Sequence, residues 1–251
     1  MDTKIDFKNP EFYENRELSW IKFDNRVLSE ARDKSIPLLE RLKFVSITSS
    51  NLDEFFMVRV ASLQDMVHAN YKKRDIAGMT ATEQLAAINK ATRELVDTQY
   101  NTYTRSLVPL LNKEGIYLVD EHETLTDEQA QFVDHYFMES VYPVLTPMAV
   151  DASRPFPLIR NKTLNIAALL SGKQNSKETV FATVQVPSVL PRLVPIPSAE
   201  GTYTFILLEQ IIERNIGLLF SNYKVLCAYP YRIMRNADLT IDEDEASDLL
   251  K

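Results

Sequence analysis

The side chains that could carry chemistry are few and scattered along the chain. The histidines are His68, His122 and His135, and none stands at metal-ligand spacing from another histidine, a cysteine or an acid cluster. We therefore expect no bound zinc and a surface position for each histidine. The single cysteine, Cys227, lies in an apolar, strand-like run, which favours a small buried residue over a reactive thiol.

Two basic stretches could contact phosphate. Arg154 and Arg160 flank the proline-rich loop RPFPLIRNK, and Arg232 and Arg235 stand in YRIMRNADL. A guanidinium group matches two phosphate oxygens at once. Exposed arginines are common, however, and alternation along a strand would place Arg232 and Arg235 on opposite faces. A solvated rim is the favoured interpretation, and phosphate contact by these four arginines stays open.

The stretch ITSSNLDEFFMVRVASL combines several charges with two adjacent phenylalanines. We expect a helix that begins near Asn51, with Asn51 as its N-cap, Glu54 in the capping-box position, and Phe55 and Phe56 as its anchors. The acids would then lie in the first turn, at the positive end of the helix dipole. The Asn51 amide also offers an adjacent donor and acceptor, which suits a base edge such as adenine, but capping is the favoured role from the residues alone. Arg59 would lie beside the phenylalanines as either a ligand or a structural residue.

Composition and charge exclude several classes of protein. The chain has 251 residues and a net charge of −7, which argues against a general nucleic-acid binder with a basic surface. One cysteine excludes an internal disulfide and fits a reducing compartment. There is no signal-peptide core, no apolar run of about 18 residues, and no glycine-rich phosphate loop. We expect a cytoplasmic protein.

The remaining elements are the scaffold for these residues, and the first half is helical. We expect an N-terminal all-α bundle over residues 1–110. Ser19 would cap a first helix and Pro37 would open a second. Thr80 with Glu83 would form a capping box for a long helix to about Leu107, which Pro109 should kink or end. The buried stripe of the first helix would be Trp20, Phe23, Val27 and Ala31.

The second half, residues 111–251, predicts an α+β domain with a largely antiparallel sheet. Thr126 and Gln129 start a helix that runs to about Val141, and a proline-punctuated loop with a short edge strand follows. Strands are expected over residues 163–170, 179–186, 203–207 and 225–235, with a helix before the last of them. A further helix would begin at Thr240. We expect a piece of a longer protein, whose second domain is incomplete and shows an open sheet edge or an exposed apolar patch.

Several long motifs resemble a known family. The segment NRELSWIKFDNRVLSEARDKSIPLLERLKFVSITSSNLDEFFMVRVASL is similar to the N-terminal domain of the long bacterial polyphosphate kinases. The segments RPFPLIRNKTLNIA, VPSVLPRLVPIP and YRIMRNADLTIDEDEASDLL are similar to the middle, or head, domain of that family. The resemblance covers the chain from Asn15 onward. It implies reversible transfer of the ATP γ-phosphate to inorganic polyphosphate, through a phosphohistidine and with Mg²⁺.

The resemblance also implies which domains carry the catalytic residues. The phosphohistidine and the Mg²⁺ ligands of the family belong to two C-terminal domains, so no catalytic and no metal-binding residue is expected here, and the chain alone should be inactive. The motif SNLDEF implies that Asn51 contacts the adenine side of ATP. Head-domain contacts imply a homodimer or tetramer, in the cytoplasm, with peripheral membrane association left open. The alternative is a stand-alone interaction or regulatory module that kept the fold without catalysis.

Overall fold

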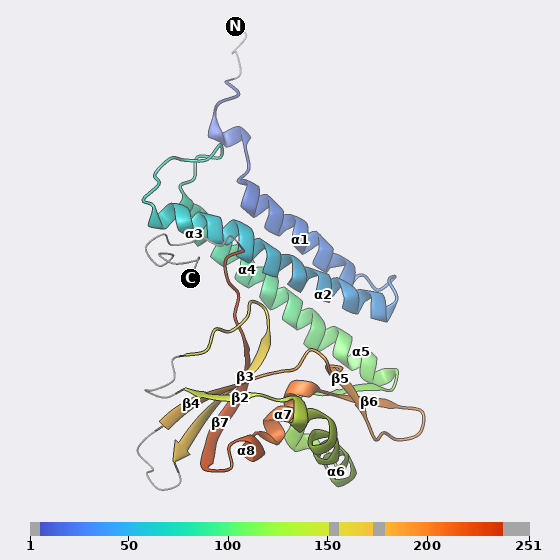
Figure 1. Cartoon of the computed structure of the whole chain (residues 1–251). Coiled ribbons are helices and arrows are strands. Elements are labelled where there is room, and N and C mark those ends of the chain that lie inside the picture. Colours follow the sequence, from blue (N-terminus) through green and yellow to red (C-terminus); the bar gives the residue numbers. More distant parts are fainter. Residues whose placement is uncertain (1–5, 151–155, 173–178, 238–251) are drawn as a thin grey trace. The chain divides into compact units, whose positions relative to one another are not determined.

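The computed structural model of the chain describes residues 6–150, 156–172 and 179–237. They form two compact units, one of residues up to 110 together with 234–237, and one of residues 111–233 (Figure 1). The last described residues group with the first unit because the Ala237 N–H donates to the Met57 carbonyl (3.0 Å) and the Asn236 amide donates to Asp65 (3.2 Å). The helix expected from Thr240 and the side chain of Arg154 lie outside the described residues.

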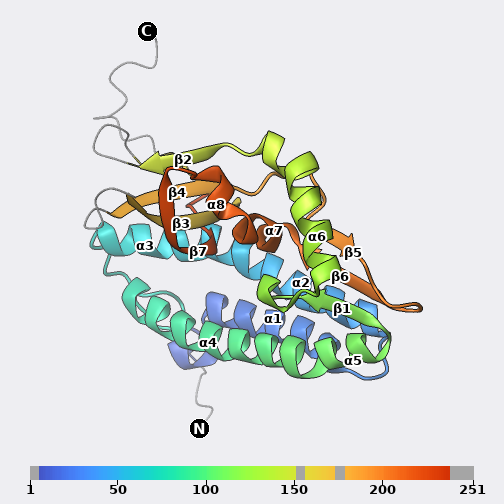
Figure 2. The same cartoon turned by 90° about the horizontal axis from the view of Figure 1, so that it is seen from below.

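The first unit is helical, as predicted. Its helices are α1 (Arg16–Arg32), α2 (Leu38–Phe55), α3 (Ala61–His68), α4 (Ala81–Thr102) and the start of α5 (Val108–Lys113), preceded by a short 3₁₀ turn at Pro10–Phe12. Helix α1 packs against both α2 and α4, and Figure 2 shows the three running side by side. Ile21, Leu28, Phe55, Ile88 and Leu95 form the centre of the apolar core between them. Among the described residues, no helix is both long and apolar enough to span a membrane.

Helices α2 and α3 are continuous through a π-helical turn, Phe56–Val60. The expectation of a helix starting near Asn51 is therefore wrong, since residue 51 lies inside α2. An N-cap needs a non-helical backbone, but no glycine or proline occurs between Pro37 and Gly78 to break the helix. The polar run TSSN is tolerated inside the helix because its side chains can form hydrogen bonds there. The Thr48 hydroxyl, for example, donates to the Phe44 carbonyl at 2.9 Å.

The other caps divide into confirmed and wrong predictions. The capping box of Thr80 and Glu83 is present, as is that of Thr126 and Gln129. Ser19 is not a cap. The side chain of Asn15 accepts the Leu18 N–H at 3.0 Å, and α1 starts one turn earlier than expected.

The long helix does not end at Pro109. Helix α4 passes through a second π-helical turn, Tyr103–Leu107, into α5. Pro109 lacks an N–H, and it follows directly on a turn in which the regular bond to residue i−4 is already replaced. Gly115, at φ +74°, follows the helix in the left-handed conformation that commonly ends helices.

The second unit combines two sheets with helices, which confirms the α+β class. The first sheet has the order β1 (Ile116–Val119), β6 (Tyr203–Leu207), β5 (Leu193–Ile196), with β1 parallel to β6 and β5 antiparallel to it. The second is antiparallel, in the order β2 (Pro147–Val150), β4 (Thr179–Gln185), β3 (Leu164–Gly172), β7 (Tyr223–Arg232). The proline-punctuated segment supplies the edge strand β2, as predicted. Strand β7 ends at residue 232, earlier than expected.

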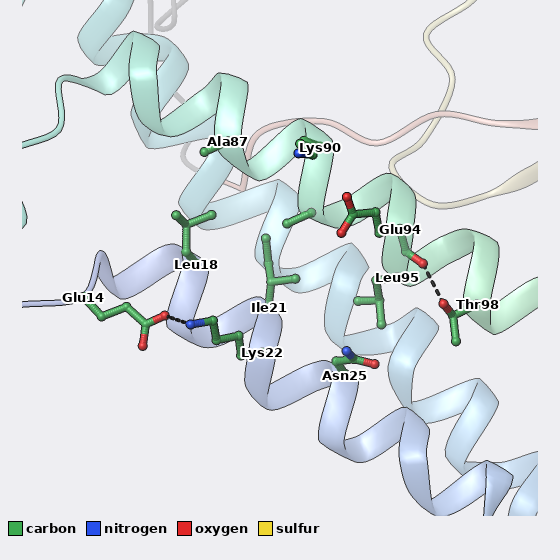
Figure 3. Close-up of a pocket in the computed structure, with 11 residues that line it drawn as sticks. Glu14, Leu18, Ile21, Lys22, Asn25, Ala87, Lys90, Glu94, Leu95 and Thr98 are labelled. Atoms are coloured by element: carbon green, nitrogen blue, oxygen red, sulfur yellow. Dashed lines mark hydrogen bonds and ion pairs between the residues drawn. The ribbon is translucent and has the colours of Figure 1, made fainter.

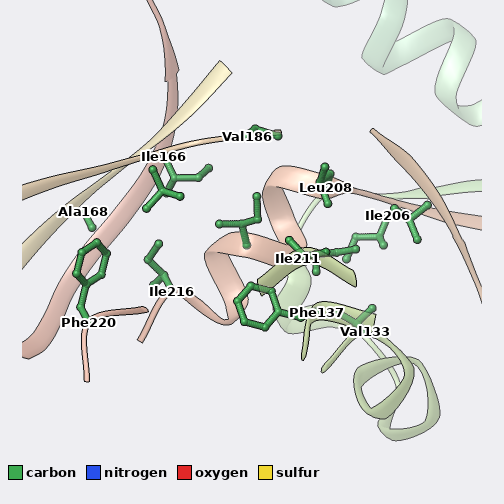
Figure 4. Close-up of a cluster of buried hydrophobic side chains, with 14 of the residues drawn as sticks. Val133, Phe137, Ile166, Ala168, Val186, Ile206, Leu208, Ile211, Ile216 and Phe220 are labelled. Carbon is green, nitrogen blue, oxygen red and sulfur yellow. The ribbon is translucent and has the colours of Figure 1, made fainter. Parts of the chain in front are cut away.

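Helices α6 (Asp127–Tyr136), α7 (Leu208–Arg214) and α8 (Ile216–Leu219) complete this unit, and a π-helical turn, Phe137–Val141, extends α6 to the predicted end. Figure 4 shows Phe137, Ile166 and Ile211 meeting in its core, where all three are fully buried. On the other face of the antiparallel sheet, Leu169 and Tyr229 remain 37% and 65% exposed. Strands β2 and β7 are the outermost strands of this sheet among the described residues.

Candidate functional site

The buried face of α1 positions the partner of Asn51. That face consists of Glu17, Ile21, Asp24, Leu28 and Ala31. It is rotated from the predicted stripe, because Phe23 is 47% exposed. Asp24 was missed by the sequence analysis. Its signal was its place between Ile21 and Leu28 at helical spacing, where an acid is unusual in an apolar stripe.

Asn51 and Asp24 form a hydrogen-bonded pair between α2 and α1. The Asn51 Nδ2 donates to Asp24 Oδ1 at 2.8 Å. Asp24 has no exposed surface, whereas Asn51 is half-buried. Burial raises the pKa of Asp24 to about 6, against the opposing effect of the hydrogen bond from Asn51. The second carboxylate oxygen, Oδ2, is buried with no hydrogen-bond partner among the described residues.

This pairing gives the Asn51 amide a defined orientation. An ionised carboxylate only accepts hydrogen bonds, so it holds the NH₂ end of the amide towards itself. The Oδ1 acceptor and the second Nδ2 hydrogen then remain for another group, since the hydrogen bond to Asp24 uses one donor. A donor and an acceptor side by side are what the edge of an adenine base requires.

Aromatic residues stabilise the same two helices one turn away from the pair. Trp20 on α1 stacks on Phe55 of α2, with ring centroids 4.3 Å apart and planes at 6°. Phe55 is 2% exposed and also meets Phe56 edge to face at 6.0 Å. The prediction that the phenylalanines anchor this helix is confirmed. The acids are not in a first turn: Asp53 is buried and Glu54 is exposed near the end of α2.

The π-helical turn decides the position of Arg59. Its extra residue rotates the helix after Phe56, so that Met57, Val60 and Leu63 are buried and Arg59 is exposed. The expected alignment of Arg59 with the phenylalanines is therefore wrong. It assumed a constant 3.6-residue period.

The other arginines considered as candidate phosphate contacts belong to different parts of the chain. Arg160 and Arg232 are exposed in the second unit, and Arg235 is exposed in the segment that groups with the first. Strand β7 ends at Arg232, so Arg235 lies beyond the strand and the alternation argument does not apply to it. Their exposure agrees with the favoured solvated rim, and phosphate contact by these arginines stays open.

The histidines and the cysteine also differ in environment. His68 is exposed, and His135 is exposed beside Glu139 at 3.1 Å. The surface position expected for His122 is wrong, because its side chain is only 17% exposed, 3.5 Å from Glu123. Cys227 is half-buried rather than buried. Among the described residues, no group of three or more His, Cys, Asp or Glu side chains is placed to hold a metal ion.

Ion pairs account for the strongest charge interactions of the second unit. Arg214 donates to Asp134 at 2.8 Å, and this hydrogen bond, ahead of the opposing effect of burial, lowers the pKa of Asp134. Arg192 binds the buried carboxylate of Glu209, which raises the pKa of Arg192. Each pair joins two segments of one unit, so both have a sufficient structural role.

A cavity of about 560 Å³ lies between α1 and α4 (Figure 3). Leu18, Ile21 and Leu95 form its apolar floor, and an ion pair of Lys22 with Glu14 lies at its rim. Asn51 and Asp24 do not line it. Lys90, Glu94 and Thr98 also line it.

Known proteins match this chain over nearly its whole length. Residues 13–119 match the polyphosphate kinase N-terminal domain, and residues 128–251 match the polyphosphate kinase middle domain. The polyphosphate kinases of Lactiplantibacillus plantarum and Halalkalibacterium halodurans are 51% and 49% identical to it over 98% of its length. The chain spans only 34% and 35% of these two relatives.

A solved structure agrees with these matches. The crystal structure of polyphosphate kinase from Porphyromonas gingivalis superposes with a TM-score of 0.79 at 31% identity, covering 91% of this chain and 34% of that one. Two domain matches in the same order, close relatives and a shared fold lead to one conclusion. The chain belongs to the polyphosphate kinase family, of which it carries the N-terminal and middle domains.

Proposed function

We propose that this protein supplies the N-terminal part of an enzyme that reversibly transfers the γ-phosphate of ATP to inorganic polyphosphate. The family membership and the names of the relatives support this proposal. In that enzyme, these residues contact the adenine of ATP, support the domains that transfer phosphate, and contribute to self-association. The phosphohistidine lies outside this chain in the proposal.

Magnesium would accompany ATP in such a reaction, and the described residues do not fit it. Mg²⁺ prefers several oxygen ligands in octahedral geometry, and no suitable cluster of acids exists among the described residues. The buried Asp24 accepts from an amide instead of facing other carboxylates. We therefore assign no step of this chain to the metal.

The hydrogen bond from Asn51 to Asp24 carries the proposed adenine contact. Adenine presents an amino donor beside a ring-nitrogen acceptor, and an asparagine amide can pair with both. Asp24 holds the amide so that its acceptor and one donor remain available. Because the supporting helices are joined by the Trp20–Phe55 stack, the amide is held before the nucleotide binds.

The test is base discrimination by the full-length enzyme. Inosine triphosphate replaces the amino donor of ATP with an acceptor, so we expect the enzyme to bind ATP more tightly. Asn51→Ala should raise the Kd for ATP about five- to thirtyfold, the scale of about 1–2 kcal/mol for a lost hydrogen bond. The Kd for inosine triphosphate should change less, which would reduce the discrimination.

Ser50→Ala is the matched control, because Ser50 is the exposed neighbour on the same helix. It should leave both affinities unchanged. If Asn51→Ala leaves the preference for ATP over inosine triphosphate unchanged, the adenine contact is contradicted.

Self-association is proposed to use the face of the antiparallel sheet opposite the core. Tyr229 and Leu169 expose apolar surface there, and such patches mark interaction sites. Tyr229→Lys should lower the dimer fraction of the full-length protein in sedimentation velocity. Tyr203→Lys is the control, since Tyr203 is similarly exposed but lies in the other sheet. Equal effects of both variants would contradict this surface.

A further inference from the structure

A polar cavity of about 420 Å³ lies in the first unit, where α1 ends and α2 begins. Arg32, Lys34 and Arg41 line one part of it, and Asn101 and Ser106 line another. Its volume falls within the range of roughly 300–1,000 Å³ typical of small-ligand sites. We propose that this cavity binds a phosphoryl oxyanion, either as a free phosphate chain or as the phosphate part of a nucleotide.

Arg41 is the central observation, because it is a buried cation. It is 5% exposed. Its Nε donates to the Ala31 carbonyl at 2.8 Å and its Nη2 to the Ser106 hydroxyl at 3.4 Å. Neither partner is a carboxylate, and no ion pair joins Arg41 to another described residue. Burying a charge without a counter-ion is costly, so the guanidinium would be stabilised by an anion in the cavity beside it.

Nearby negative charge offsets that cost only in part. The carbonyl that Arg41 binds lies at the C-terminal, negative end of α1. Asp33 is the neighbouring acid, and its carboxylate accepts the N–H and the hydroxyl of Ser35 at 2.8 Å. These bonds are the main cause of its lowered pKa, and the charge of Arg41 is the smallest one. Asp33 is therefore engaged elsewhere.

The remaining groups make the cavity rich in donors. Arg32 and Lys34 are exposed cations, and no acid lines the cavity, although the chain as a whole carries a net charge of −7. The hydroxyls of Thr98 and Thr102, which also line it, already donate to backbone carbonyls at 2.8 and 2.7 Å. The Asn101 amide and the Ser106 hydroxyl remain as further donors. Three cations and several neutral donors favour a ligand with multiple negative oxygens.

Phosphate chemistry fits this set better than a carboxylate. Two guanidinium groups can each bind two oxygens, and a phosphoryl group presents more charge and more oxygens than one carboxylate. The cavity is separate from the Asn51 pair: residues 41 and 51 stand ten positions apart on α2, about 15 Å along the helix. The proposal does not depend on the adenine contact.

The experiment is calorimetric titration of the 251-residue chain with pyrophosphate, tripolyphosphate and ATP. We expect saturable binding of pyrophosphate or tripolyphosphate that weakens as salt rises. The double variant Arg32→Ala/Lys34→Ala should raise the Kd about tenfold or more, because it removes two charge-assisted contacts. It leaves Arg41 in place, so the contact with Ala31 that supports the fold is kept.

The matched control is Lys22→Ala/Arg26→Ala, which removes two exposed cations from the same helix α1. It should change the Kd by less than about twofold from the wild-type value. Salt screens exposed charges, so cations that do not line the cavity should contribute little. Equal weakening by both double variants, or no binding of either phosphate chain, would overturn the proposal.

The three ligands also distinguish the source of the phosphate. If tripolyphosphate binds as tightly as ATP, and the cavity variant Arg32→Ala/Lys34→Ala loses both, the cavity recognises the phosphate chain alone. ATP binding that exceeds tripolyphosphate and is weakened by the cavity variant supports a nucleotide. ATP binding that depends on Asn51 but not on Arg32 and Lys34, with no tripolyphosphate binding, supports the adenine contact and refutes the cavity.

Discussion

Asn51 on α2 donates a 2.8 Å hydrogen bond to Asp24 on α1, a carboxylate with no exposed surface. Two opposing effects act on the pKa of Asp24, and burial is the larger of them. Burial disfavours the charged form of Asp24 and raises its pKa to about 6, while the bond from Asn51 partly opposes that shift. Above pH 6 the bundle therefore holds a buried charge whose one hydrogen-bond partner among the described residues is the Asn51 amide that it orients.

Replacing Asp24 by Asn should stabilise the protein at neutral pH. The folded-state pKa is raised above the ordinary 3.8, so the folded state binds more protons between about pH 4 and 6. The stabilisation from this residue is present below pH 4 and is lost as pH rises through 6. Asp24→Asn, which cannot ionise, should raise the free energy of unfolding by about 1–3 kcal/mol at pH 7.5 and leave it unchanged at pH 4. Urea unfolding at both pH values measures this.

Asp97→Asn on α4 is the control for that measurement, because Asp97 is exposed and should give no pH-dependent difference. If Asp24→Asn changes the free energy of unfolding equally at pH 4 and pH 7.5, burial of the charge does not cause the change.

The same substitution should weaken ATP binding by the full-length enzyme despite the gain in stability. An asparagine at position 24 can donate or accept, so it no longer imposes one orientation on the Asn51 amide. We expect a Kd for ATP about two- to tenfold higher at pH 7.5, a fraction of one hydrogen bond. Unchanged affinity in a variant that is more stable would show that Asp24 does not position Asn51.

Asn51→Asp should destabilise the helical unit, and more strongly at high pH. If residue 51 were a helix cap, aspartate would replace it well. Inside α2 it instead places a second carboxylate against the buried Asp24, and two such groups share one proton. We expect a loss of about 1–3 kcal/mol at pH 8 and a smaller one at pH 5, measured by thermal unfolding. Asn25→Asp, an exposed site on α1, is the control. Wild-type stability of Asn51→Asp at pH 8 would refute the buried pairing.

The features that were predictable depend on residues close together in sequence. The capping boxes at Thr80 and Thr126 join residues three apart, and strand β6 follows from one apolar run with turn residues before it. The pairing of Asn51 with Asp24 joins residues 27 apart, and the parallel pairing of β1 with β6 joins residues 87 apart. No local pattern encodes those distances.

The wrong predictions for Arg59 and Phe23 have one shared physical cause, which is helical phase. A π-helical turn at Phe56–Val60 changes the face of every following residue, and this exposes Arg59. In α1 the start at Arg16 and the buried acids Glu17 and Asp24 shift the apolar stripe away from Phe23. Polar residues on a buried face hide it from a count of apolar positions.

Trp20→Ala should therefore cost far more stability than Phe23→Ala. Trp20 stacks on the buried Phe55 at 4.3 Å. Phe23 is 47% exposed, and the guanidinium of Arg26 lies 5.8 Å from its ring centroid. We expect losses of about 2–4 kcal/mol for Trp20→Ala and under about 1 kcal/mol for Phe23→Ala in chemical unfolding. Comparable losses for the two variants would support the predicted stripe, which included both residues, over the observed face.

The 251-residue chain should neither make nor consume polyphosphate by itself. A phosphate-accepting histidine needs an accessible nitrogen and groups that stabilise the transferring phosphate. His68 and His135 lie exposed on helices, the latter beside the carboxylate of Glu139, which would repel a phosphate. His122 is mostly buried next to Glu123. We expect no phosphate transfer above a blank when the chain is incubated with ATP, Mg²⁺ and polyphosphate, while the full-length enzyme turns over under the same conditions. Turnover by the short chain that is lost on replacing one of these three histidines by alanine would place the phosphohistidine within these residues.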